Sequence, residues 1–178
     1  MSDKMTPEQR HRCMSRVSSK NTKPELLVRK YLFANGFRYR VCVKELPGKP
    51  DIVLPKYRTV VFVNGCFWHG HGCGFYSFPK SNVAFWEKKI ERNRERDRNE
   101  EADLRRMGWH VIRIWECQLK PKVRAATLES LAYTLNRIFL TDRGADMPVK
   151  AYEEQNPETA VAAEEEPEYG KRINNYIK

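Results

Sequence analysis

Residues 59–73 read TVVFVNGCFWHGHGC. The stretch begins as an apolar run of strand length and turns at Gly65. The eight residues 66–73 then hold two cysteines, two histidines, a phenylalanine and a tryptophan. A further thiol, Cys117, follows a second apolar run far downstream. A site that used all of these side chains would join distant parts of the chain, so we expect the other elements to be arranged around it.

Four of these side chains make a set that favours zinc. Three thiolates and one imidazole suit a closed, structural, tetrahedral site, and the set consists of Cys66, His71, Cys73 and Cys117. The spacing within the loop is tighter than in common zinc fingers. The set is informative because it predicts how distant parts of the chain are held together. A bound metal would order a glycine-rich loop and hold the residues between the ligands at its tip.

His69 is the second histidine of the loop, and the zinc set does not require it. One interpretation makes it an alternative ligand or a solvated side chain. The other makes it a general base, because imidazole accepts a proton from water near neutral pH. The second role needs a carboxylate that orients the ring.

Asp51 follows a proline at the start of a predicted strand and precedes the hairpin that leads to the loop. A hard oxygen ligand there favours magnesium, which can bridge to a substrate phosphate and activate a water. The alternative is a local hydrogen bond within a proline-rich turn.

The strands expected around the loop form a meander, followed by one later strand. Residues 37–43, FRYRVCV, alternate with the period of a half-buried strand, which places Cys42 on the polar side. A proline- and glycine-containing turn leads to the next strand. The predicted strands are residues 37–43, 51–54, 59–64 and 109–115.

Capping signals and apolar spacing predict four helices, at residues 7–17, 22–35, 82–107 and 122–140. The last carries apolar residues from Val123 to Phe139 and closes the core. In and after the first helix, Arg12, Arg16 and Lys20 contact phosphate or form a solvated face. Met14 is an ordinary packing residue unless it is inserted into DNA.

Two acids on these helices have a structural and a functional interpretation. Glu25 stands where a Thr-x-x-Glu capping box needs an acid, so helix capping is the simpler explanation. Asp97 falls on the inward stripe of the long helix, with Trp86, Ile90 and Leu104. A salt bridge to a neighbouring arginine and a role in a site are equally compatible with that position.

The charge of the chain is unevenly distributed. The net charge is +10 over 178 residues; residues 141–178 hold 5 basic and 9 acidic side chains, a net of −4, which leaves +14 for residues 1–140. A basic domain of this kind favours a polyanionic partner, and a merely solubilising surface is the alternative. The sequence has no apolar run of spanning length and no signal-peptide core, so we expect a cytoplasmic protein without membrane contact.

Five segments in order resemble the very short patch repair (Vsr) endonucleases over roughly residues 5–140. They are Asn21-Thr22-Lys23-Pro24-Glu25, Leu46-Pro47-Gly48-Lys49-Pro50-Asp51, Gly65-Cys66-Phe67-Trp68-His69-Gly70-His71, Arg96-Asp97-Arg98, and Gly108-Trp109 through Trp115-Glu116-Cys117. The resemblance implies an α/β, restriction-endonuclease-like single domain, residues 1–140, with a central mixed sheet flanked by helices. We expect residues 141–178 to be a disordered acidic tail.

The resemblance also implies an activity, a magnesium-dependent nick in DNA 5′ to the thymine of a T:G mismatch. Asp51 and the backbone carbonyl of Val63 would bind the catalytic magnesium, His69 would be the base, and Glu25 and Asp97 would complete the active site. The four ligands named above match the structural zinc site of the family.

The family further implies a wedge into the duplex beside the mismatch, made by Phe67, Trp68 and Trp86, with Met14 inserting from the other side. For the loop aromatics, core packing is the alternative. The chain departs from the family at Asn64, where members often carry a histidine that helps to organise metal-bound water. Asn can bond to water but cannot take up a proton, so we expect retained but altered activity.

Double-stranded DNA with a T:G mismatch is thus the expected partner of a monomeric, nucleoid-associated enzyme. Mismatch-repair proteins and a DNA cytosine methyltransferase system are further candidate partners. Two alternatives remain: a nuclease of the same fold that serves restriction or mobility and cuts unmismatched DNA, and a zinc-stabilised DNA-binding module without strong catalysis.

Overall fold

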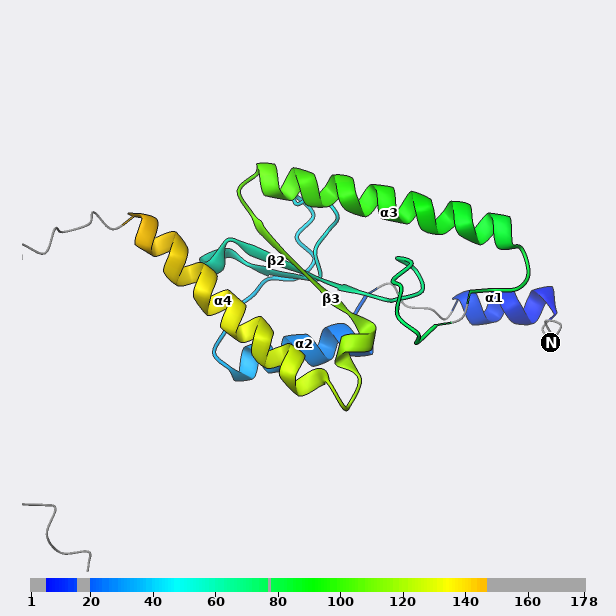
Figure 1. The fold of residues 1–178 in the computed structure, drawn as a ribbon, viewed down its shortest axis with the longest axis horizontal. Coiled ribbons are helices and arrows are strands. Elements are labelled where there is room, and N and C mark those ends of the chain that lie inside the picture. The colour runs from blue at the N-terminus through cyan, green and yellow to red at the C-terminus, as the bar shows by residue number, and fades with distance from the viewer. Residues whose placement is uncertain (1–5, 16–19, 77, 147–178) are drawn as a thin grey trace, which may run out of the picture. The chain divides into compact units, whose positions relative to one another are not determined.

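The computed structural model describes residues 6–15, 20–76 and 78–146. Four α-helices, three strands and two short 3-10 helices follow one another in this part of the chain (Figure 1). In order they are α1 (Pro7–Ser15), α2 (Lys23–Ala34), β1 (Ile52–Leu54), η1 (Pro55–Tyr57), β2 (Thr59–Asn64), α3 (Val83–Arg106), β3 (His110–Trp115), η2 (Glu116–Leu119) and α4 (Arg124–Asp146).

The sheet is mixed, as predicted, with β2 between the other two strands. β1 pairs antiparallel with β2, Ile52 opposite Val61, and β3 pairs parallel with β2, Thr59 opposite His110. A parallel pair needs a crossover connection, and α3 lies in that connection. Because β2 and β3 run in the same direction, both end at the same edge of the sheet, Asn64 beside Trp115.

The strand predicted for residues 37–43 is wrong. Only Arg40 forms a bridge, an antiparallel pair with Val53 in which each N–H donates to the other carbonyl. The alternation holds as far as half-buried Tyr39 and then fails, because Val41 is exposed and Cys42 has a left-handed φ of 55°. That conformation interrupts an extended strand, so no three-stranded meander forms.

The first three helices, α1, α2 and α3, begin within one residue of the predicted positions. The box at α1 is reciprocal: the Thr6 N–H donates to Gln9 Oε1 and the Gln9 N–H donates to Thr6 Oγ1. The last two residues predicted for that helix lie outside the described residues. α4 starts two residues later than predicted and continues to Asp146, past the expected boundary at residue 140. Val123, predicted to face the core, is exposed.

The core lies on both faces of the sheet, because alternate strand residues point in opposite directions. Val61 packs on one face against residues of α2 and α4, among them Leu32 and Leu135. Val60 packs on the other face against Leu104 of α3. The arrangement is thus three-layered, with α3 on one side of the strands and α2 and α4 on the other (Figure 1).

The inward stripe predicted on α3 is also present. Ile90, Asn93 and Leu104 are buried, and Trp86 and Asp97 are half-buried. The stripe therefore places one acid of the helix against the rest of the domain.

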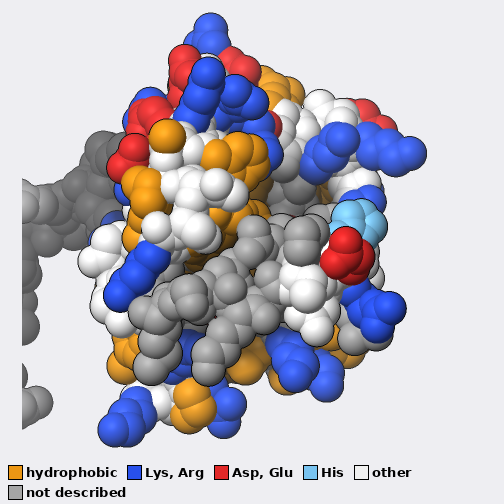
Figure 2. Space-filling view, turned by 90° about the vertical axis from the view of Figure 1, so that its right-hand side faces the viewer, with side chains coloured by type: hydrophobic (Ala, Val, Ile, Leu, Met, Phe, Trp, Pro, Cys, Tyr) orange, Lys and Arg blue, Asp and Glu red, His pale blue; other side chains and the backbone are white. Residues whose placement is uncertain are grey.

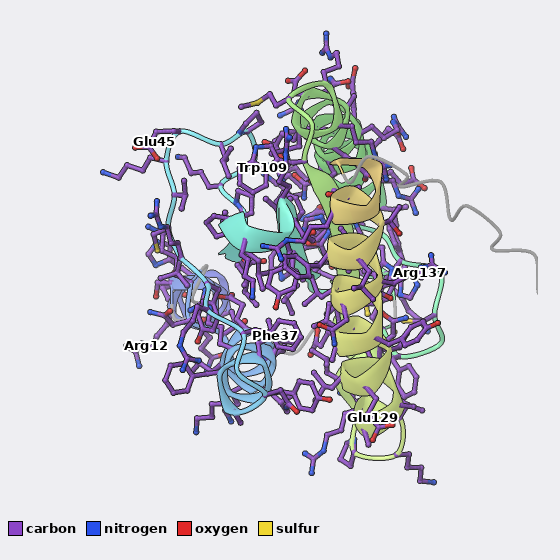
Figure 3. The ribbon with its side chains drawn as sticks, turned by 90° about the vertical axis from the view of Figure 1, so that its left-hand side faces the viewer. Arg12, Phe37, Glu45, Trp109, Glu129 and Arg137 are labelled. Atoms are coloured by element: carbon purple, nitrogen blue, oxygen red, sulfur yellow. The ribbon has the colours of Figure 1, made fainter. Side chains whose placement is uncertain are left out.

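The surface is rich in basic side chains. Lys and Arg lie in several groups around the face shown in Figure 2, with hydrophobic side chains between them. Figure 3 shows the opposite side, where Phe37 lies between α2 and α4. None of the helices in the described ranges has both the length and the apolar character of a membrane span.

Candidate active site and metal centre

A cleft of about 1060 Å³ lies where the start of α2, the β1–β2 hairpin, the loop after β2 and the middle of α3 meet. All five residues predicted to be catalytic line it: Glu25, Asp51, Asn64, His69 and Asp97. These residues come from four different parts of the chain. The fold therefore brings together what the sequence could only name separately.

Asp51 is half-buried at the entrance of β1, where its Oδ2 accepts a hydrogen bond of 2.8 Å from the Val63 N–H. Burial raises the pKa of the Asp51 carboxyl to about 6; the hydrogen bond from Val63 opposes this, and the charge of Glu25 adds to it. A carboxylate that is costly to ionise gains from a nearby cation. The chemistry of this position therefore fits a hard metal ion.

Glu25 caps its helix and also faces the cleft, so both interpretations apply to it. It is buried, and its carboxylate accepts from the Asn21 N–H, at 2.9 Å, and from the Thr22 hydroxyl, at 2.8 Å. Arg29, one turn further along α2, donates to the same carboxylate at 3.0 Å. The acid is therefore held in one orientation beside Asp51.

His69 has the carboxylate partner that a base requires. Its Nδ1 forms a short hydrogen bond to Oδ2 of Asp97. Burial acts to raise the pKa of Asp97, but the hydrogen bond and charge of His69, with those of Arg96, outweigh it and lower the pKa. Because Nδ1 is bound to an ionised partner, Nε2 is the nitrogen that can exchange a proton.

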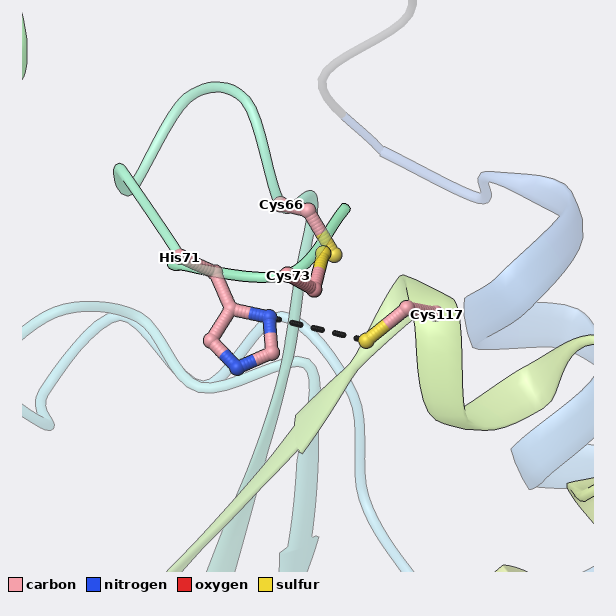
Figure 4. A group of neighbouring side chains, drawn as sticks. All are labelled: Cys66, His71, Cys73 and Cys117. Carbon is pink, nitrogen blue, oxygen red and sulfur yellow. Dashed lines mark hydrogen bonds between the residues drawn. The ribbon is translucent and has the colours of Figure 1, made fainter. Parts of the chain in front are cut away.

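The four predicted zinc ligands form a cluster (Figure 4). Their ligand atoms all lie within 4.8 Å of one another, and in the described part of the chain no other group of this kind is present. Cys66 and Cys117 each stand two residues beyond the paired ends of β2 and β3, which explains their proximity. The Cys117 Sγ lies 3.5 Å from Nδ1 of His71.

The donor set of the cluster, three thiols and one imidazole, fits zinc. Burial raises the pKa of the Cys66 thiol to about 12, and burial also raises that of Cys117. A cation is therefore what would hold these buried sulfurs as thiolates. His71 is fixed by stacking on Trp115, with ring centroids 4.1 Å apart.

The loop between the ligands is docked on α3. The Asn93 side chain donates to the Trp68 carbonyl at 2.8 Å, and Arg94 donates to the Gly70 carbonyl. Gly70 has a φ of 59°, and a Cβ there would meet Ile90 Cγ2 at 2.6 Å. Only glycine fits that close approach.

The three predicted wedge aromatics contact one another. Phe67 lies 5.0 Å from Trp68 and 5.1 Å from Trp86 between ring centroids, and all three are half-buried. Tyr76 and Phe85 extend the group, at 5.8 Å from Phe67 and 5.3 Å from Trp86 respectively. Trp68 also lines the cleft.

The predicted N-terminal contacts are only partly described. Arg12 is exposed on α1, and Lys20 is exposed and lines the cleft. Arg16 and the side chain of Met14 lie outside the described residues.

Several residues of the cleft escaped the sequence reasoning. Arg29 follows Glu25 by four residues, a spacing that could have identified it as a partner. Glu100 also lines the cleft, where burial raises the pKa of its carboxyl. Glu116 and Arg113 face the cleft from the end of β3, and no local signal distinguishes them from surface charges.

Several known proteins are similar in sequence to this chain. The family described as DNA mismatch endonuclease Vsr matches residues 2–74. Type II nicking enzyme V.NmeAIP of Neisseria meningitidis serogroup A is 54% identical over 122 residues, covering 68% of this chain and 87% of the relative. Type II nicking enzyme V.XorIIP of Xanthomonas oryzae pv. oryzae is 51% identical over 119 residues, covering 67% and 88%.

The DNA mismatch endonuclease Vsr of Escherichia coli K12 is 38% identical over 120 residues, covering 67% of this chain and 77% of the relative. The chain therefore belongs to the DNA mismatch endonuclease Vsr family, and it is a DNA endonuclease of that family.

Proposed function

We propose that this protein nicks one strand of duplex DNA 5′ to the thymine of a T:G mismatch and so initiates very short patch repair. The observation that carries the proposal is the meeting of Asp51, Glu25 and the His69–Asp97 pair in one cleft beside an aromatic cluster. The E. coli relative is named a mismatch endonuclease. We also propose that the fold is of the restriction-endonuclease-like type.

Magnesium would be held by Asp51 and the Val63 carbonyl, where it would lower the pKa of a water and neutralise charge on the phosphate. His69 would take the water proton at Nε2 while the water oxygen attacks phosphorus; the P–O bond to one sugar oxygen breaks, and that leaving oxygen takes up a proton from solvent. Asp97, kept ionised, holds the ring and stabilises the imidazolium that forms. Glu25 adds negative charge beside Asp51 and so favours a divalent cation there.

Mismatch preference is assigned to Phe67, Trp68 and Trp86, with Met14 on the other side of the base step. Inserting aromatic rings between bases costs a few kcal/mol of unstacking, and a mismatched pair lowers that cost. Half-buried rings that already contact one another can enter as a preformed group. Arg12, Arg16 and Lys20 are assigned to the phosphate backbone.

We further propose a structural metal, an oligomeric state, a cellular location and partners for the enzyme. Zinc occupies the Cys/His cluster, the protein acts as a monomer on the nucleoid in the cytoplasm, and the residues that follow α4, which ends at Asp146, are a separate acidic tail. Mismatch-repair proteins and a cytosine methyltransferase system are the candidate partners.

A second candidate function is nicking of matched DNA at a specific sequence. The names of two relatives, Type II nicking enzymes, favour strand-selective cutting without mention of a mismatch. The chemistry of the cleft is the same in both cases, and only the role of the aromatic cluster differs.

A cleavage assay with magnesium on duplexes that cover every mismatch and the matched pairs tests these proposals. We expect a T:G duplex to be nicked, and Asp51→Ala and His69→Ala to lose activity by at least about a hundredfold with zinc content unchanged. Glu129→Ala, an exposed acid on α4, is the control. Unchanged cleavage by Asp51→Ala would rule out the mechanism, and equal cleavage of matched duplexes would favour the second function.

A further inference from the structure

Arg29 is a buried charge on α2 that the mechanism above does not use. It is 8% exposed and lies one helical turn after Glu25. A buried ion pair is weak evidence of a contribution to stability, so the reason for an arginine there lies in what it holds.

The guanidinium bonds to three residues from two parts of the chain. Nη1 donates to Oδ1 of Asn21 at 2.7 Å, and Nη2 donates both to Oε2 of Glu25, at 3.0 Å, and to the backbone carbonyl of Asp51, at 2.9 Å. Asp51 is thus held from two sides, by Arg29 at its carbonyl and by the Val63 N–H at its carboxylate.

The contact with Asn21 reaches the rim of the cleft. Asn21 has a left-handed φ of 55°, and it directly follows Lys20, which lines the cleft. By fixing the Asn21 side chain, Arg29 also fixes where the chain enters the cleft from its N-terminal side. One residue therefore links that entry to both acids.

This geometry costs free energy of desolvation, because the buried Nε of Arg29 has no hydrogen-bond acceptor among the described residues. A residue selected by packing alone would avoid that loss. Lysine could keep the charge beside Glu25, but a single ammonium does not reproduce a planar fork aimed at three acceptors.

We propose that Arg29 is a positioning residue of the nuclease, which sets the backbone of Asp51 and the carboxylate of Glu25 so that both face the cleft. The inference rests on the proposed function, because it gives Asp51 a role in hydrolysis. Arg29 acts through these residues and does not itself contact the reacting atoms.

The test compares full-length Arg29→Lys and Arg29→Ala with the full-length wild type, and the substrate is an intact duplex with a T:G mismatch. For Arg29→Lys we expect kcat to fall about tenfold to a hundredfold, with KM for DNA, zinc content and unfolding temperature close to those of the wild type. We also expect magnesium added without DNA to raise the unfolding temperature of the wild type more than that of Arg29→Lys. Lys30→Met, an exposed cation on the same helix, should match the wild type.

Chemical rescue separates positioning from structural support. Arg29 lines the cleft, so added guanidinium can reach the space that Arg29→Ala leaves, and we expect it to restore several-fold of the lost kcat at a temperature where the variant is folded. Wild-type kcat in Arg29→Lys would overturn the inference. So would a loss of activity that follows loss of folded protein and that guanidinium does not restore.

Asp51→Ala, measured in parallel, distinguishes the two possible failures. Full activity in that variant removes the proposed function itself, whatever Arg29 does. An inactive Asp51→Ala beside a fully active Arg29→Lys removes only the inference about Arg29.

Discussion

The Cys/His cluster and the acidic cleft adjoin one another, since the loop that holds three soft ligands also carries His69, yet the two are assembled differently. In the cluster, four ligand atoms lie within 4.8 Å of one another. In the cleft, each acid is held by a different neighbour: Asp51 by Val63, Glu25 by Arg29 and Asp97 by His69. One region supplies a complete coordination set, and the other fixes groups around an open space.

Substitutions in the two regions should therefore have different effects on stability and on activity. A closed set contributes folding free energy through its metal, so damage to it should spread to the whole loop. An open site leaves coordination positions to water and substrate, as magnesium sites usually do, so damage there should affect activity before stability. Substitutions in each region test this division.

Cys117→Ala should damage both regions. We expect bound zinc to be lost, the unfolding free energy to fall by several kcal/mol and nicking to disappear, because the loop that holds His69 loses its anchor on η2. Metal analysis, thermal unfolding and the cleavage assay measure the three effects. Cys42→Ala, at an exposed thiol outside the cluster, is the control. Retained nicking after complete loss of zinc would show that the two regions are independent.

Asp51→Asn, unlike Cys117→Ala, should stabilise the protein. It should also abolish nicking. The folded pKa of about 6 lies above the ordinary value of 3.8, so ionisation of Asp51 costs stability as pH rises through this window. Without added magnesium, we expect the variant to be more stable above about pH 6, by at most about 3 kcal/mol, at about 1.4 kcal/mol per pKa unit. Below about pH 4 the two proteins should be equally stable.

Denaturant unfolding between pH 4 and pH 8 measures this difference. Asn keeps an oxygen that accepts from the Val63 N–H, so the comparison isolates the charge. A difference in unfolding free energy that does not change with pH would contradict a raised pKa of the Asp51 carboxyl. Added magnesium should narrow the difference, because it stabilises only the protein that binds it.

Asn64→His should have the smallest effect. Asn64 is buried at the end of β2 and lines the cleft, and a histidine there could take up a proton that Asn cannot. We expect kcat to change by about tenfold or less, with zinc content unchanged. Steady-state nicking rates provide the measurement, with Asn64→Ala as a matched variant. Equal rates for wild type and Asn64→His would show that this position does not tune the reaction.

The sequence predicted the parts of the molecule that depend on local pattern. The bounds of β2, the capping box of α1 and the three ligands within the loop, Cys66, His71 and Cys73, all follow from short-range spacing. The failures have non-local causes. The left-handed backbone at Cys42 interrupts an alternation that looks like a strand, and Arg29 acquires its role only when the start of β1 packs beside α2.

The parallel pairing of β2 with β3 has a consequence for how the enzyme is made. Cys117 is synthesised 117 − 73 = 44 residues after Cys73, and it reaches the loop only when α3 has crossed over and β3 has paired. A nascent chain therefore displays three of the four ligands while the last is still within or behind the ribosome. We therefore expect the segment that carries His69 to reach its final form late, and the nuclease to become competent only once most of its domain has emerged.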